Sequence, residues 1–131
     1  MKFTNDTDDF AVLPDGEYVG TVLSLGKRAK DDKVSVYFNV SINGETYKTR
    51  YMSMSDKAKG FITEAFRKIG DPIPKGWSGE LEERSIRGLK VLFAQRDAKE
   101  YNGKTYKELV PVKPLGRATD EELLALEGAP F

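Results

Sequence analysis

The chain has 131 residues, the size of one ordinary domain, with a hydrophobic fraction of 39%, a charged fraction of 32% and a formal net charge of zero. Cysteine and histidine are both absent, which excludes disulfide frameworks, thiolate chemistry, Ser-His-Asp and Cys-His nucleophilic sites and nearly every zinc site. We therefore expect a soluble, folded protein that is not an enzyme, binds no metal and needs no cofactor.

Charge is distributed unevenly along the chain. Residues 1–17 hold one Lys against five acidic residues, a net charge of −4. Residues 18–117 hold twenty Lys or Arg against twelve acidic residues, a net charge of +8, and residues 118–131 hold four acidic residues and no base. A basic body with acidic ends is typical of a domain that binds a polyanion, although chance variation of surface charge also produces such patterns.

The apolar residues predict neither a membrane span nor a secretory signal. No apolar run approaches the ~18 residues of a membrane helix, and the chain turns acidic at Asp6, where a signal peptide would become apolar. We therefore expect a cytoplasmic protein without membrane contacts.

Three strands are predicted in the first half of the chain. Residues 16–26 carry the β-branched and aromatic content of a strand, and residues 27–33 form a polar, basic loop. Residues 33–42 then alternate between apolar and polar side chains, which is the clearest strand pattern in the sequence. Asn43-Gly44 is a preferred type I′ hairpin turn, so residues 45–54 are predicted to return as a third strand.

A single amphipathic helix is predicted after the third strand. Asp56 is a candidate N-cap, the apolar residues up to about Ile69 have helical spacing, and Gly70 is a stop signal. Residues 71–79 form a loop by their Pro and Gly content, and Trp77 within it is expected to pack in the core or as a lid.

Two further strands complete the predicted domain. Residues 88–96 form the fourth strand, and Asn102-Gly103 marks a hairpin into a fifth strand over residues 105–112. The order predicts an all-β fold with one helix, namely a five-stranded Greek-key OB-fold barrel with the helix between strands 3 and 4, over residues 1–117. Another partly closed barrel, or a β-sandwich with one helix, would give a similar pattern.

The Asn43-Gly44 turn predicts which residues of the second and third strands face each other. A two-residue turn places Ile42 opposite Glu45. On the inner face, the predicted pairs are Val36–Tyr51, Phe38–Thr49 and Val40–Tyr47, so both tyrosines are expected in the core. On the outer face, the predicted pairs are Ser35–Met52, Tyr37–Arg50 and Asn39–Lys48. A register slip of one residue would exchange the two faces.

The predicted outer face suits single-stranded nucleic acid. Bases stack on aromatic rings with about 1–3 kcal/mol per base, and Lys and Arg follow the phosphates. The loops at residues 27–33 and 96–104 add basic side chains at the positions where OB-folds bind ligands. The candidate DNA-binding residues are Lys27, Arg28, Lys30, Lys33, Tyr37, Asn39, Lys48, Arg50, Arg96, Lys99, Tyr101 and Lys104. The alternative interpretation is an ordinary solvated sheet face.

The last segment, residues 118–131, has two interpretations. Thr119 and Glu122 form a capping box, which predicts a short leucine-containing helix that docks on the barrel or on another subunit. The segment also fits an acidic tail that binds partner proteins. The candidate partner-binding residues of this tail are Asp120, Glu121, Glu122, Pro130 and Phe131.

The acidic tip ending in Pro130-Phe131 resembles those of bacterial and phage single-stranded DNA-binding proteins, which dock onto replication and repair partners. Residues 16–115 also resemble phage-encoded OB-fold proteins of this class. The segments that carry this resemblance are Gly16-Glu17-Tyr18, residues 33–40, Asn43-Gly44, residues 61–70 and residues 88–93.

This resemblance implies sequence-independent binding of single-stranded DNA in phage replication, recombination or repair, in the host cytoplasm, with partner proteins recruited through the tip. The alternative class is a non-catalytic protein-interaction or structural module on a β-barrel scaffold, and a magnesium-dependent nuclease is a distant third. The sequence leaves open whether the chain forms a homo-oligomer.

Overall fold

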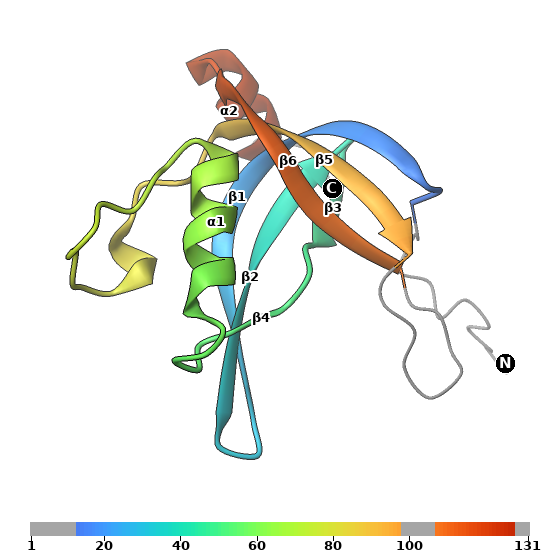
Figure 1. Ribbon diagram of the computed structural model, residues 1–131. Coiled ribbons are helices and arrows are strands. Elements are labelled where there is room, and N and C mark those ends of the chain that lie inside the picture. Colours follow the sequence, from blue (N-terminus) through green and yellow to red (C-terminus); the bar gives the residue numbers. More distant parts are fainter. Residues whose placement is uncertain (1–12, 98–106, 128–131) are drawn as a thin grey trace, which may run out of the picture.

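The structure, a computed structural model, is a strongly twisted antiparallel sheet with one main helix packed against it (Figure 1). It describes residues 13–97 and 107–127. Within these ranges the strands are β1 (Gly16–Lys30), β2 (Lys33–Ile42), β3 (Glu45–Lys48), β4 (Met52–Ser53), β5 (Leu89–Asp97) and β6 (Lys107–Arg117). The helices are α1 (Lys59–Ile69), the short 3-10 helix η1 (Leu81–Glu83) and α2 (Asp120–Glu127).

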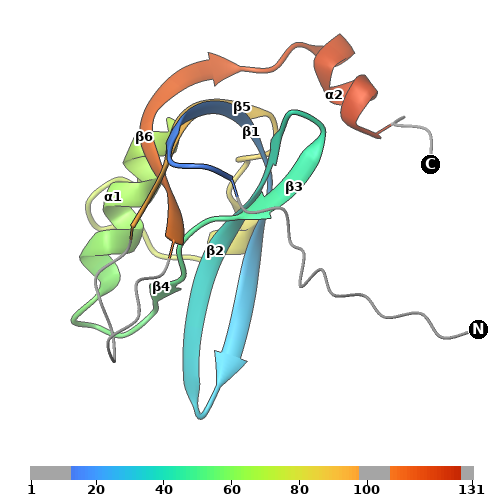
Figure 2. The ribbon, with the colours of Figure 1, turned by 90° about the vertical axis from the view of Figure 1, so that its right-hand side faces the viewer.

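The strands form one sheet in the order β3-β2-β1-β5-β6, and β4 also pairs with β2. The long strand β1 joins the two halves of this sheet, because its first part pairs with β5 and its second part with β2. It curves strongly between them (Figure 2). The Arg50 N–H, in the segment between β3 and β4, donates to the Leu109 carbonyl of β6 at 2.9 Å, so a hydrogen bond links this segment to the edge strand β6.

The hydrophobic core lies between the inner face of the sheet and α1, which packs against β6, β4 and β5. The buried face of α1 carries Ile62, Ala65, Phe66 and Ile69. Phe66 meets Phe38 of β2 edge to face, with ring centroids 5.3 Å apart. This one contact joins the sheet and the helix at the centre of the core, where both rings are fully buried.

Most of the predicted elements are confirmed, with changes at their ends. The second strand has the predicted bounds, and the helix ends at Gly70 in the left-handed conformation, with φ 94°. Asp56 does not cap α1: the N-cap residue is Ala58, and the Asp56 carboxylate pairs with Lys59 at 3.0 Å instead. The predicted third strand is divided into β3 and β4. The Asn102-Gly103 turn lies outside the described residues.

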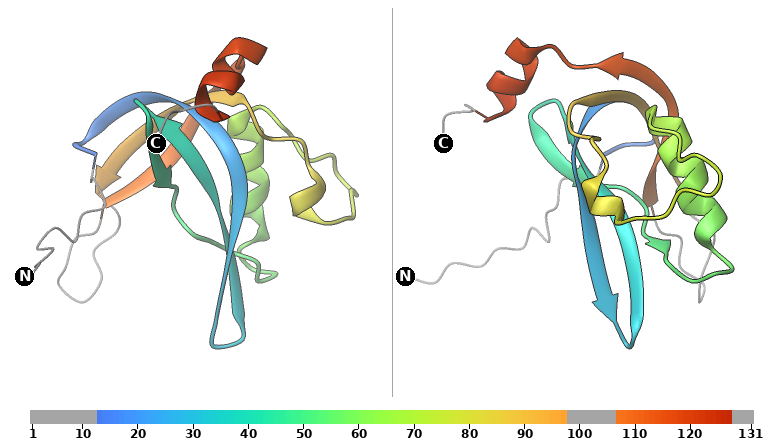
Figure 3. Two further views of the ribbon diagram at one scale, coloured as in Figure 1. Left: turned by 180° about the vertical axis from the view of Figure 1, so that it is seen from behind. Right: turned by 90° about the vertical axis from the view of Figure 1, so that its left-hand side faces the viewer.

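The loop predicted over residues 27–33 is wrong. β1 and β2 stay paired to Lys30 and Lys33, and a two-residue turn at Asp31-Asp32 closes the hairpin. Both aspartates have positive φ, 52° and 62°, which suits a type I′ turn and which Asp tolerates better than most residues. The end of this hairpin, residues 27–34, projects well beyond the rest of the sheet (Figures 1 and 3), and we call it the arm.

Close packing at Gly20 of β1 makes this residue sensitive to substitution. A Cβ atom there would lie 2.9 Å from Ile42 and 3.0 Å from the Phe93 ring. We expect Gly20→Ala to lower the free energy of unfolding by about 1–3 kcal/mol, because inserting a methyl group strains a filled core. Urea denaturation measures this difference. Gly60→Ala is the control, since nothing lies within 4 Å of that Cβ position; equal stability of the two variants would contradict the prediction.

The loop between α1 and β5 is held by an ion pair rather than by core packing of Trp77. The Arg84 guanidinium binds Asp71 with two hydrogen bonds, of 2.6 and 2.9 Å, which raises the pKa of Arg84. Its Cζ lies 4.9 Å from the centroid of the Trp77 ring, a cation–π distance. Trp77 is 36% exposed, so the expected packing in the core is wrong, and its ring lies against Arg84 at the surface.

The C-terminal segment forms the predicted capped helix over residues 120–127. The Glu122 N–H donates to the Thr119 hydroxyl at 3.2 Å, and the Thr119 N–H donates to the Glu122 carboxylate, also at 3.2 Å. Leu123 lies over Gly88, and Lys90 of β5 pairs with Glu122 at 2.9 Å, which lowers the pKa of that carboxyl. In Figure 2, α2 and the arm lie at opposite ends of the molecule. Pro130 and Phe131 lie outside the described residues.

Candidate functional site

A β-bulge after β3 determines which side chains share the outer face of the sheet. The predicted register holds from Ile42–Glu45 to Asn39–Lys48. Thr49 continues it with two bonds to Phe38: its N–H donates to the Phe38 carbonyl at 3.0 Å, and its hydroxyl accepts the Phe38 N–H at 2.9 Å. The next observed pair is Val36–Met52. Two residues, Arg50 and Tyr51, therefore lie opposite the single residue Tyr37.

This bulge overturns two of the predicted pairs and alters a third. Ser35 pairs with Ser53 and Val36 with Met52, so the pairs Ser35–Met52 and Val36–Tyr51 are wrong, and Tyr37 has both Arg50 and Tyr51 opposite it instead of Arg50 alone. Tyr51 is 42% exposed on the outer face instead of lying in the core, whereas Tyr47 packs against the core as predicted. The Arg50 side chain turns toward α1, where its Cζ lies 5.9 Å from the centroid of the Phe61 ring.

The outer face holds two tyrosines between two cations. The rings of Tyr37 and Tyr51 meet edge to face, with centroids 5.0 Å apart and an interplanar angle of 64°. Lys48 Nζ lies 5.2 Å from the centroid of Tyr37, and Arg28 Cζ lies 5.2 Å from that of Tyr51. We call Arg28, Tyr37, Lys48 and Tyr51 the tyrosine cluster. All four come from the adjacent strands β1, β2 and β3 or from the bulge beside them, so the sheet fixes their spacing.

Gly26 of β1 makes room for the tyrosine cluster. It pairs with Tyr37, and a Cβ atom on it would lie 2.2 Å from the Tyr37 ring. The ring therefore lies directly over the glycine backbone. Next along this face, the Asn39 amide donates to the Ser24 hydroxyl at 3.0 Å, so Asn39 shares the face with Tyr37 but is bound to a neighbouring strand.

The candidate cations fall into two groups according to their partners. Lys27 pairs with Glu82 at 2.9 Å, a hydrogen bond that raises the pKa of Lys27, and Arg50 and Arg96 share Glu108 at 3.7 and 3.3 Å. Arg28, Lys30, Lys33 and Lys48 have no carboxylate partner among the residues that the structure describes. Strand pairing places Lys30 and Lys33 opposite each other at the arm tip, on the face that carries Tyr37.

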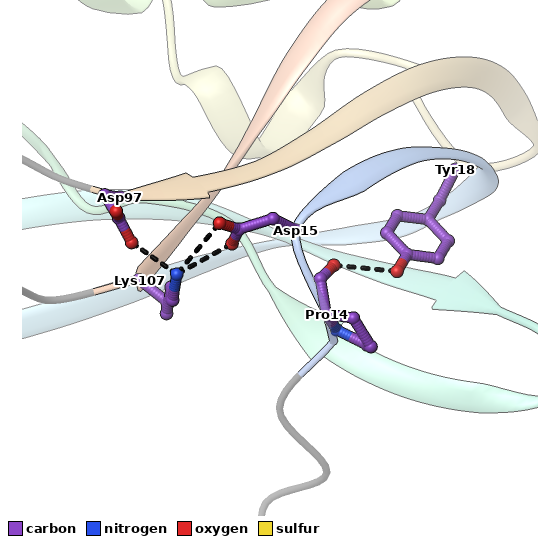
Figure 4. A network of polar contacts seen from close by, with 5 residues as sticks. All are labelled: Pro14, Asp15, Tyr18, Asp97 and Lys107. Atoms are coloured by element: carbon purple, nitrogen blue, oxygen red, sulfur yellow. Dashed lines mark hydrogen bonds and ion pairs between the residues drawn. The ribbon is translucent and has the colours of Figure 1, made fainter.

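A second polar network lies at the base of the β5–β6 hairpin (Figure 4). Lys107 Nζ donates to both carboxylate oxygens of Asp15, at 2.8 and 3.0 Å, and to Asp97, and these hydrogen bonds raise the pKa of Lys107. The Tyr18 hydroxyl donates to the Pro14 carbonyl at 2.7 Å nearby. Two acids on one Lys leave no net positive charge here, so this network fixes the start of β1 rather than extending the basic surface. Lys99, Tyr101 and Lys104 lie outside the described residues.

Sequence reasoning missed Tyr51 as a surface residue, and a weak signal for it exists. The apolar residues change from odd positions, as at Tyr47, to the even positions Met52 and Met54, both of which contact the core. That change of parity indicates an extra residue between the two segments.

No protein-family model and no curated protein matches the chain. Within the described residues, no group of three or more acidic residues is arranged to hold a metal ion, and no helix has the length and apolar character to cross a membrane.

Proposed function

We propose that the chain binds single-stranded DNA, without sequence preference, on the outer face of β1, β2 and β3. The observation that carries this proposal is the tyrosine cluster, in which two partly exposed rings lie between two cations that no described carboxylate neutralises. Aromatic rings beside a basic track are the two elements that sequence-independent strand binding requires.

Each part of the cluster has a separate task in this proposal. Tyr51 offers its exposed ring to a base, and Tyr37 supports it from the side with its own ring. Arg28 and Lys48 contact the phosphates on either side, and the arm adds Lys30 and Lys33. Every base has a π-face and every nucleotide a phosphate, so these contacts do not distinguish one sequence from another.

The proposed fold is the OB-fold, and two features support it. If β3 and β4 are counted as one strand broken by the bulge, residues 13–97 and 107–127 form five strands, with α1 between the third and the fourth. The hydrogen bond from Arg50, between β3 and β4, to Leu109 of β6 brings the two ends of the sheet together, which supports a closed barrel.

The wider role is proposed from the resemblance of the sequence. A phage-type protein of this kind would protect exposed strands during replication, recombination or repair, in the cytoplasm of the host. The acidic segment with Pro130 and Phe131 would recruit replication or recombination proteins. The rival class is a protein-interaction module, which the exposure of two apolar side chains favours: Phe61 is 61% exposed and Leu124 is 65% exposed.

The test is fluorescence anisotropy of labelled oligo-dT titrated with the protein at low and moderate salt, with duplex DNA as competitor. We expect tight binding that weakens with salt and that duplex does not displace. Absence of binding at low salt would overturn the proposal, leave the outer face as ordinary solvated surface and favour the interaction module.

Gly26→Ala tests the tyrosine cluster without removing either ring. The new Cβ would overlap the Tyr37 ring, so the ring must move and the cluster is disturbed. We expect about tenfold weaker oligo-dT binding, near the lower end of the stacking energy of one base. Gly60→Ala is the matched control, because that Cβ meets nothing within 4 Å. Equal affinities of the two variants would mean that the position of Tyr37 is unimportant.

A further inference from the structure

An open cleft of ≈ 400 Å³ lies on the other side of the bulge, between α1 and strands β5 and β6. Phe61 of α1 and Val112 of β6 line it with apolar surface and are 61% and 38% exposed. Arg50, Lys68 and Arg96 also line it, each from a different element of the fold. The cleft thus combines an exposed aromatic ring with three cations.

Two of the cleft cations already bind an oxyanion that does not itself line the cleft. The Glu108 carboxylate lies 3.7 Å from Arg50 and 3.3 Å from Arg96, with its side chain only 15% exposed. Each guanidinium has five N–H donors, so both keep donors for a further acceptor, and phosphate oxygens suit the same fork geometry.

The net charge of the cleft is positive. Among the residues that line it, the acid Glu64 is paired with Arg67, a hydrogen bond that lowers the pKa of Glu64. Lys68 has no carboxylate partner in the part of the chain that the structure describes. With Glu64 balanced by Arg67, the three cleft cations face the one neighbouring carboxylate of Glu108, and this excess of positive charge favours an anionic occupant.

The cleft is continuous with the tyrosine cluster through two consecutive residues. The bulge directs Tyr51 to the outer face and Arg50 into the cleft. A strand that leaves Tyr51 along the edge of the sheet therefore meets Arg50 next. Here the Arg50 guanidinium lies 5.9 Å from the centroid of the Phe61 ring, so the cleft, like the tyrosine cluster, places a cation beside an aromatic ring.

We infer that a nucleic-acid strand bound on the tyrosine cluster continues over the bulge into this cleft. There Arg50, Lys68 and Arg96 contact its phosphates, and a base packs on Phe61. This inference rests on the proposed function, because it describes where a strand bound on the tyrosine cluster continues. It also predicts that the cleft contributes only when the strand is long enough to reach both surfaces.

The experiment compares oligo-dT of about 4 and about 16 nucleotides, the range of site sizes of single domains of this kind. The variant is Phe61→Ala with Lys68→Ala, and both residues lie on the exposed side of α1, outside the tyrosine cluster. We expect affinity for the long strand to fall about tenfold, and the salt slope to become shallower by about 0.7 through the loss of Lys68, whereas affinity for the short strand stays unchanged. Lys57→Ala is the charge control, because Lys57 precedes α1 and does not line the cleft.

The outcomes separate this inference from the function on which it rests. If the cleft variant binds the long strand as tightly as the wild type, while a Tyr51→Ala variant binds it weakly, the inference is overturned, the function stands, and a protein partner is favoured for the cleft. If the wild type binds neither strand, both are overturned. Equal weakening for the two lengths would also overturn the inference, because a short strand would then already reach the cleft.

Discussion

Replacing Tyr37 and Tyr51 together with alanine should weaken oligo-dT binding by about 100-fold, or about 3 kcal/mol. Each ring is a stacking surface worth about 1–3 kcal/mol, and the two rings touch, so their contributions do not simply add. Anisotropy titration at low salt measures the change. Because both side chains lie on the outer face, the midpoint of urea unfolding should change little.

The control for this prediction keeps the rings and removes only the hydroxyl groups. Tyr37→Phe with Tyr51→Phe should bind nearly as tightly as the wild type, because stacking uses the ring. If the phenylalanine variant loses as much affinity as the alanine variant, hydrogen bonds from the hydroxyl groups matter and stacking does not. If the folded alanine variant binds as tightly as the wild type, the strand does not contact the tyrosine cluster.

The regular part of the fold could be predicted because it depends on local signals. The alternation of residues 33–42 and the Asn43-Gly44 turn together determine the register of four residue pairs, and the structure has all four. Gly70 ends α1 for an equally local reason, since glycine adopts positive φ without steric strain.

The site depends on two irregularities for which the local sequence carries a weak signal, as at the bulge, or a misleading one, as in the arm. At the bulge, the Arg50 N–H bonds to Leu109 of β6, a partner far away in the sequence, and this bond draws the chain out of the simple register. In the arm, adjacent aspartates resemble a loop, because Asp is depleted in strands. In the structure both aspartates have positive φ and form a two-residue turn. This turn pairs Lys30 with Lys33.

The bulge and the arm also explain why some candidate cations have a carboxylate partner and others do not. Without the bulge, Arg50 would share the outer face with Tyr37, and with it Arg50 faces α1 and pairs with Glu108. Because the arm is a hairpin rather than a loop, its successive side chains alternate between two faces. Lys27 thereby lies on the opposite face from Arg28 and reaches Glu82.

The salt dependence of DNA binding should distinguish the cations that have a described carboxylate partner from those that have none. Four cations on the tyrosine face lack a described carboxylate partner, namely Arg28, Lys30, Lys33 and Lys48. If each neutralises one phosphate, log affinity should fall with log salt at a slope of about −3, so that a tenfold rise in salt weakens binding about 1000-fold. With a long strand in the cleft, Lys68 and the Arg50–Arg96 pair that shares Glu108 add about two further charges, so the slope should steepen to about −4. Anisotropy titrations over a series of salt concentrations measure this slope.

Two lysines of the same arm provide the matched comparison for this slope. Lys30→Ala removes a cation with no described carboxylate partner and should make the slope shallower by about 0.7, the single-strand value for one phosphate. Lys27→Ala removes the same charge, but Lys27 Nζ is held by Glu82 at 2.9 Å on the opposite face of the hairpin, so the slope should hardly change. Equal effects of the two variants would mean that only the total charge of the arm matters. A larger effect of Lys27→Ala would place the strand on the other face, away from the tyrosine cluster.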